Sequence, residues 1–69
     1  MITTVQIRQR LSEAIMQSGM TLTALAKALN VKQPTISQYL SGRALPALDT
    51  LVNLCKLLDV DTNYILCQN

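Results

Sequence analysis

Apolar residues recur along this chain at intervals of three and four residues, the spacing of an amphipathic helix. The first such stretch begins at Thr3 or Thr4, either of which can cap a helix, and ends at Gly19, which favours a left-handed helix end. Its apolar residues are Ile7, Leu11, Ala14 and Ile15. We expect these to face the core and the polar residues of the same stretch to be solvated: Arg8, Gln9, Glu13 and Gln17.

The middle of the chain predicts two shorter helices. One runs from the cap Thr21 to Asn30, a residue that tolerates a left-handed turn. The other runs from about Gln33 to Leu40, and Gly42 ends it. The residues expected to be buried here are Leu22, Leu25, Ala26, Leu29, Val31, Ile36, Tyr39 and Leu40.

A fourth helix is predicted after Pro46, and Asp49 in its first turn suits the positive end of a helix. Its broad apolar face makes it the expected centre of the core: Leu48, Leu51, Val52, Leu54, Cys55 and Leu58. Asp61 then caps a last short helix, residues 62–66. Together the pattern predicts a compact all-α fold of five short helices in one domain, residues 1–69.

Composition points the same way. The chain has 69 residues, 49% of them apolar, and it contains no Phe, Trp or His. A chain this short buries only about 60% of its unfolded surface, so it must use its aliphatic residues efficiently. The alternation and paired turn signals of a small β-barrel are absent, which favours a bundle of helices.

Other features argue against several classes of protein. Cys55 and Cys67 form no C-x-x-C pair and no histidine could complete a metal site, so we expect two reduced, structural thiols rather than a disulfide. No apolar run approaches the roughly 18 residues of a membrane span, and the N-terminus lacks the order of a signal peptide. We therefore expect a cytoplasmic protein. Without clustered carboxylates, a nucleophile with a base or a phosphate loop, we expect no enzyme, cofactor or metal.

Charge is unevenly distributed, although the formal net charge is only +2. Residues 21–45 contain no acid and carry Lys27, Lys32 and Arg43. Residues 46–69 carry Lys56 together with the acids Asp49, Asp59 and Asp61. The middle of the chain is therefore the cationic part, which a polyanion would favour.

Residues 21–41, "TLTALAKALNVKQPTISQYLS", have the internal spacing of a helix-turn-helix motif. Leu25 and Ala26 are apolar where the two helices would cross, Asn30 makes the turn, and Ile36 locks the pair together. In such a motif the second helix lies in the major groove of DNA, with its N-terminal residues near base edges.

These residues give the chain its resemblance to the phage Cro and CI repressor type of helix-turn-helix, also called the xenobiotic-response-element type. The matching strings are "GMT" at 19–21, "LAKAL" at 25–29, "V-x-Q-x-TIS-x-Y" at 31–39, "SGR" at 41–43, "P-x-L-x-TL" at 46–51 and "LLDV" at 57–60. The match covers roughly residues 5–66. It implies a lambda-repressor-like fold and a DNA-binding transcriptional regulator, in particular a phage- or prophage-like repressor.

Four positions depart from the pattern of that family. Leu22 stands where members often have a glutamine that helps to clamp a phosphate. Lys32 and Ala47 stand where a Ser or Thr usually caps a helix, and Leu40 replaces a frequent Glu. The first departure concerns a DNA contact, and the others concern helix ends and surface character.

Several residues of the predicted third helix are suited to contact base edges. Gln33 and Gln38 can each bond to N6 and N7 of adenine, and the resemblance implies contact at both positions. Lys32 can reach a guanine or a phosphate, while Pro34 fits the first helical turn and can touch a thymine methyl group. The expected base-contact set is Lys32, Gln33, Pro34, Ser37 and Gln38.

The expected phosphate contacts are Thr21, Thr35, Ser41 and Arg43. Such contacts position a protein on DNA without specifying sequence. For Thr21 a simple capping role is the alternative, and Lys27 is expected to be solvated.

One such module buries only about 600–1,000 Å², which favours a homodimer on a pseudo-palindromic operator with half-sites about 34–36 Å apart. Apolar residues in excess of the needs of the core are candidates for the interface: Leu45, Leu57, Tyr64, Ile65 and Leu66. The alternative is an antitoxin-like or anti-repressor-like protein-interaction module on the same fold. The modest charge and Leu22 motivate that alternative.

Overall fold

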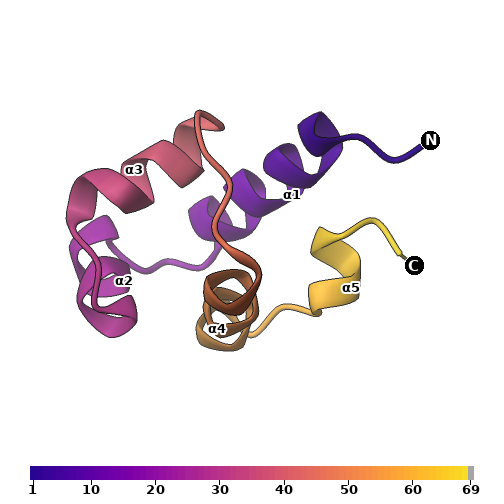
Figure 1. Cartoon of the computed structure of the whole chain (residues 1–69). Helices are drawn as coiled ribbons and strands as arrows, with labels where there is room; N and C mark the ends of the chain where they lie inside the picture. Colours follow the sequence, from indigo (N-terminus) through magenta and orange to yellow (C-terminus); the bar gives the residue numbers. More distant parts are fainter. Residues whose placement is uncertain (69) are drawn as a thin grey trace.

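The computed structural model describes residues 1–68 and consists of five α-helices joined by short turns and loops (Figure 1). The helices are α1 (Thr4–Gln17), α2 (Leu22–Leu29), α3 (Gln33–Ser41), α4 (Leu48–Leu58) and α5 (Thr62–Ile65). No strand occurs in these residues, so the predicted all-α fold of five helices is confirmed. None of the helices described is both long and apolar enough to cross a membrane.

The helix ends follow from local chemistry. The Thr3 hydroxyl accepts a hydrogen bond from the Gln6 N–H, and the Gln6 side chain accepts one from the Thr3 N–H, which forms a capping box at the start of α1. The hydroxyl of Thr21 accepts the N–H of Ala24 at 3.0 Å and so caps α2. Asn30 and Gly42 end α2 and α3 with φ of 58° and 80°, the left-handed conformation that terminates a helix.

A single cluster of buried apolar residues forms the core between the helices. Its members are Leu11, Ala14, Ile15, Leu25, Ala26, Ile36, Tyr39, Leu51, Leu54, Cys55, Leu58 and Ile65. Four of the five helices contribute two or more of these residues, and α5 contributes Ile65 alone. Burial raises the pKa of the Cys55 thiol, since a thiolate is poorly solvated there, and both this thiol and that of Cys67 are free.

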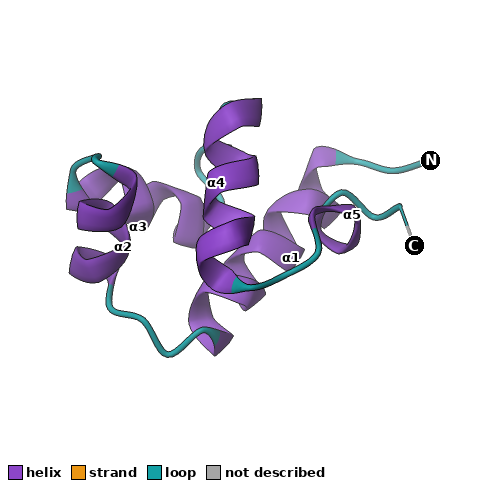
Figure 2. Cartoon of the chain, turned by 90° about the horizontal axis from the view of Figure 1, so that it is seen from below, coloured by secondary structure: helices purple, strands orange, loops and turns teal. Residues whose placement is uncertain are grey.

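The molecule is elongated, and its two ends differ. The helices α2 and α3 lie together at one end, both chain termini lie at the other, and α4 lies between them (Figures 1 and 2). Helix α1 packs along α3 and also contacts α5, so it joins the two ends.

The core-facing side of α4 is narrower than the sequence predicts. Leu48 is 79% exposed and Val52 is 41% exposed, although both were expected in the core. Successive helical positions are about 100° apart, so Val52, which follows the buried Leu51, is turned to the flank of the helix. Leu48 lies in the first turn of α4 and stays outside the cluster.

One candidate interface residue lies in the core. Ile65 has no exposed surface, because α5 is a single turn that points this side chain into the core. Its contact with a second molecule stays a prediction. Of the other candidates, Leu57 and Tyr64 are exposed, and Leu45 and Leu66 are half-buried.

The two faces of α4 predict opposite results for two similar truncations. Leu54→Ala should lower the free energy of unfolding by about 2–5 kcal/mol, because it opens a cavity at a fully buried site. Leu48→Ala should change it by less than about 0.5 kcal/mol, since most of that side chain is in solvent. Urea denaturation followed by circular dichroism measures both. Similar losses for the two variants would contradict the described burial of α4.

Candidate nucleic-acid interface

Helices α2 and α3 pack directly against each other and are joined by only three residues, 30–32. The left-handed turn at Asn30 reverses the chain, and the Val31 N–H then donates to the carbonyl of Ala26 at 2.9 Å. Leu25 and Ile36 are fully buried where the helices meet. This is the geometry of a helix-turn-helix, with α3 as the second helix.

The five residues expected to contact bases lie together on the exposed side of α3 and at its start. Lys32, Gln33, Pro34, Ser37 and Gln38 are all exposed. Ile36 and Tyr39 lie on the opposite side of the helix and are buried, which fixes the direction in which the exposed residues face. The structure therefore brings the whole predicted set onto one surface.

The start of α3 is open toward solvent. Lys32 is the N-cap residue, and its side chain makes no capping hydrogen bond. Pro34 lies in the first turn, where its missing N–H costs nothing. The partial positive charge of the helix end and the Lys32 ammonium group therefore reinforce each other at this point.

The expected phosphate contacts fall into two groups. Thr21 is exposed at the start of α2, while Ser41 and Arg43 are exposed at the far end of α3. Thr35 is half-buried on the flank of α3 and is the least accessible of the set. Leu22 is also half-buried and packs against the core cluster, so it contributes to packing where a glutamine would be polar.

The electrostatics of this end of the molecule are one-sided. Residues 14–48 contain no Asp or Glu, and within them Lys27, Lys32 and Arg43 are exposed. The four acids of the chain lie elsewhere: Glu13, Asp49, Asp59 and Asp61. No acid of the sequence segment that forms α2 and α3 offsets the positive charge, which suits a polyanionic ligand.

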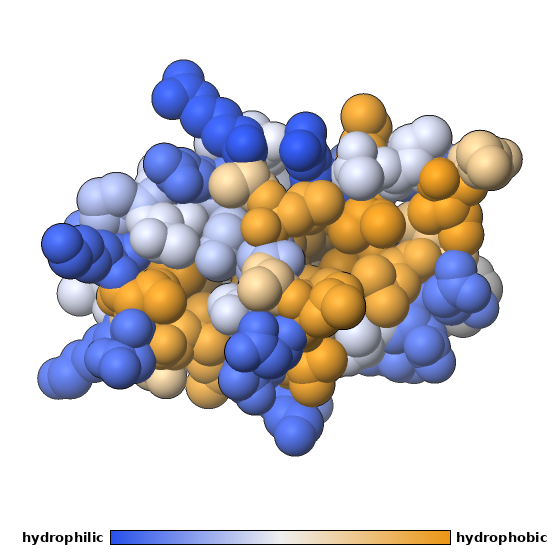
Figure 3. All heavy atoms as spheres, viewed as in Figure 1, coloured by the Kyte–Doolittle hydropathy of each residue, from blue (hydrophilic) through white to orange (hydrophobic). Residues whose placement is uncertain are grey.

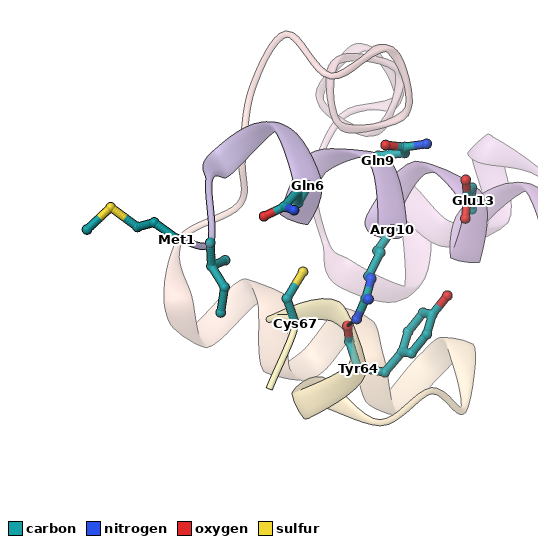
Figure 4. Close-up of a pocket in the computed structure, with 8 residues that line it drawn as sticks. Met1, Gln6, Gln9, Arg10, Glu13, Tyr64 and Cys67 are labelled. Atoms are coloured by element: carbon teal, nitrogen blue, oxygen red, sulfur yellow. Dashed lines mark hydrogen bonds between the residues drawn. The ribbon is translucent and has the colours of Figure 1, made fainter. Parts of the chain in front are cut away.

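Two arginines of α1 are less solvated than the sequence suggests. Arg10 is half-buried, donates to the Tyr64 carbonyl oxygen at 2.6 Å and lies 4.6 Å from the centroid of the Tyr64 ring. Figure 4 shows this pair beside a hollow of about 590 Å³ between α1 and α5. Arg8 was expected to be solvated, but it is half-buried and its Nε is fully buried. Helical spacing alone could not predict the burial of either arginine, because it depends on how α1 packs against other elements.

No group of three or more His, Cys, Asp or Glu side chains in residues 1–68 is arranged to hold a metal ion. The exposed side of α3 gathers polar side chains with hydrogen-bonding ability.

Comparison with known proteins agrees with this geometry. A family model described as Helix-turn-helix matches residues 11–65, most of the chain. The chain is therefore a helix-turn-helix DNA-binding transcription regulator. It belongs to the Cro/CI-type helix-turn-helix family, as the sequence resemblance indicated. No curated protein and no solved structure gives a significant match.

The uncapped start of α3 predicts that stability and DNA binding can be moved in opposite directions. Lys32→Ser should raise the free energy of unfolding by about 1 kcal/mol, because a serine side chain can accept an N–H of the first turn. The same change should weaken DNA binding, because it removes a cation. Thermal denaturation and fluorescence anisotropy with labelled duplex measure the two effects.

Ala47→Ser is the matched control, since α4 also lacks a side-chain cap and Ala47 carries no charge. It should stabilise the fold by a similar amount and leave DNA affinity unchanged. Unaltered affinity in Lys32→Ser would remove Lys32 from the DNA contacts.

Proposed function

We propose that the protein is a sequence-specific transcriptional repressor, of the phage or prophage type, which binds an operator with α3 in the major groove. The observation that carries the proposal is the exposed side of α3, where polar side chains with hydrogen-bonding ability gather at the start of the helix. A helix-turn-helix presents this part of its second helix to base edges.

Base recognition would rest chiefly on the two glutamines. Gln33 is in the first turn of α3 and Gln38 is in its second half, so they can address successive parts of one half-site. Each can accept from N6 and donate to N7 of an adenine. Pro34 and Ser37 lie between them in sequence, and Lys32 stands at the mouth of the helix.

Phosphate contacts would fix this helix in the groove from two sides. Thr21 and the free N–H groups of the first turn of α2 face one strand of the duplex. Ser41 and Arg43 face the backbone at the other end of α3, and Thr35 supplies a hydroxyl on its flank. Contacts of this kind set register and orientation.

The repressor would act as a homodimer on a pseudo-palindromic operator. One module covers about 600–1,000 Å², little for a specific site, and a two-fold dimer doubles the contact. Exposed apolar side chains supply a surface for it: Leu48, Val52, Leu57 and Tyr64. Figure 3 shows apolar surface continuing from α4 toward the end that carries the termini. Half-buried Leu45 and Leu66 can contribute further contact area.

Base contact is tested by replacing one glutamine. Gln33→Ala should cost about 1–3 kcal/mol of binding free energy on an operator selected from random duplexes, and little on random DNA. Gln17→Ala is the matched control, because Gln17 is an exposed glutamine at the end of α1. Anisotropy titrations on both duplexes give the four affinities.

Equal losses on operator and random DNA would exclude Gln33 from base contact. If the unaltered protein bound no duplex in a salt-dependent way, the protein-interaction module would be the better description, since phosphate binding releases counterions.

The proposed dimer surface is tested by replacing one of its apolar residues with a charged residue. Leu48→Glu should shift sedimentation toward the monomer and weaken operator binding, because a carboxylate would be buried at the interface. Met16→Glu, at a side chain that is 71% exposed on α1, should leave both unchanged. A wild-type protein that is monomeric at tens of micromolar, both free and on DNA, would contradict the dimer.

A further inference from the structure

A hollow of about 470 Å³ lies between α1 and the C-terminal end of α3. Arg8 and Ser12 line it from α1, while Leu40, Ser41 and Gly42 line it from the end of α3. The Ser12 hydroxyl donates to the Leu40 carbonyl oxygen at 2.7 Å and fastens the two helices together. Arg8 precedes Ser12 by four residues, so the two side chains leave α1 on the same side.

Arg8 brings a charge into this hollow, and one donor of its guanidinium group lacks a hydrogen-bond partner. Its Nε is fully buried and has no hydrogen-bond partner. Leu40 is apolar, so this α3 side chain supplies no carboxylate. Glu13 also lines the hollow, five residues along α1 from Arg8, but no ion pair joins these two side chains. A buried charged donor without a partner is costly, which favours a ligand that neutralises the guanidinium.

Arg10 shows the contrast on the same helix. Its guanidinium is already engaged by the carbonyl oxygen and ring of Tyr64. The two arginines are therefore in different states: the Arg10 guanidinium is bonded within the protein, and that of Arg8 has a buried donor without a partner. The negative end of the α3 dipole lies near Arg8 and stabilises its charge without occupying its whole fork of N–H groups.

The hollow opens at the end of the exposed side of α3. Ser41 follows Ser37 by four residues and Gln38 by three, so it shares their face of the helix. Nine residues of α-helix span about 13.5 Å, close to the major-groove width of about 12 Å. With the start of α3 at the bases, its C-terminal end therefore comes near the phosphates that border the groove.

We infer that Arg8 is a further DNA contact, in which its guanidinium binds the phosphodiester at the groove edge beside the Ser41 hydroxyl. The planar fork of an arginine suits two phosphate oxygens, and the half-buried Arg8 side chain keeps part of its surface open to such a ligand. Helix α1 then takes part in binding together with the helix-turn-helix. This inference rests on the proposed binding of DNA by α3.

The test compares two variants that each remove one positive charge. Arg8→Met keeps an apolar stem without the guanidinium, and Lys56→Met removes an exposed cation from α4. Affinities for a selected operator and for a random duplex are measured by anisotropy over a series of KCl concentrations. Arg8→Met should weaken both by about tenfold. It should also reduce the slope of log K against log[KCl] by about 0.9 per protomer. Lys56→Met should change neither.

A second measurement uses the unaltered protein and locates the contact. Operators with single uncharged methylphosphonate linkages are scanned along each strand. One linkage should weaken the wild type and have no further effect on Arg8→Met, the signature of two coupled groups. Arg8→Lys keeps an apolar stem and the positive charge, so it should retain the slope. If circular dichroism shows that Arg8→Met does not fold, Arg8→Lys replaces it in the scan.

The outcomes are distinguishable. The inference is overturned, while DNA binding stands, if Arg8→Met matches Lys56→Met in slope and affinity. It is also overturned if no methylphosphonate linkage weakens binding by the wild type more than binding by the Arg8 variant. If the wild type itself binds neither duplex in a salt-dependent way, the proposed function fails and the inference fails with it.

Discussion

The turn between α2 and α3 is the constraint on which the rest of this structure depends. One residue in the left-handed conformation, Asn30, and one hydrogen bond, from Val31 to Ala26, determine how α3 leaves α2. Once that angle is set, Ile36 must enter the core and the opposite side of α3 must face outward. The exposed side of α3, which we propose binds DNA, is therefore a consequence of packing.

The remaining helices hold that unit in place. Helix α4 packs against α2 and supplies Leu54 and Cys55 to the core, while α1 packs along α3 and supplies Leu11. A chain of 69 residues buries a smaller fraction of its surface than a large domain does, so each helix buries only part of its apolar surface. That leaves apolar flanks on α4, such as Leu48, for which the described residues provide no cover.

Local rules predicted the helices and their ends well, because a cap or a left-handed turn involves only residues close in sequence. The cap at Thr21 and the helix end at Asn30 are of this kind. The errors at Leu48 and Arg8 both concern burial, which depends on elements distant in sequence. Periodicity identifies an apolar side of a helix, but it does not say how far a neighbouring helix extends along that side. The roles of the α3 residues stay predictions, because the bases that they contact depend on the operator, whose sequence the protein chain does not specify.

The pairing of Arg10 with Tyr64 has an experimental consequence of its own. The chain has two tyrosines and no tryptophan, so its ultraviolet emission comes from these two rings without transfer to an indole. Tyr39 is buried within the α2–α3 unit, whereas Tyr64 is 43% exposed beneath a guanidinium at the opposite end of the molecule. A single-tyrosine version of the protein would therefore report on one end alone. Loosening of α5 and opening of the core could then be followed as separate optical events.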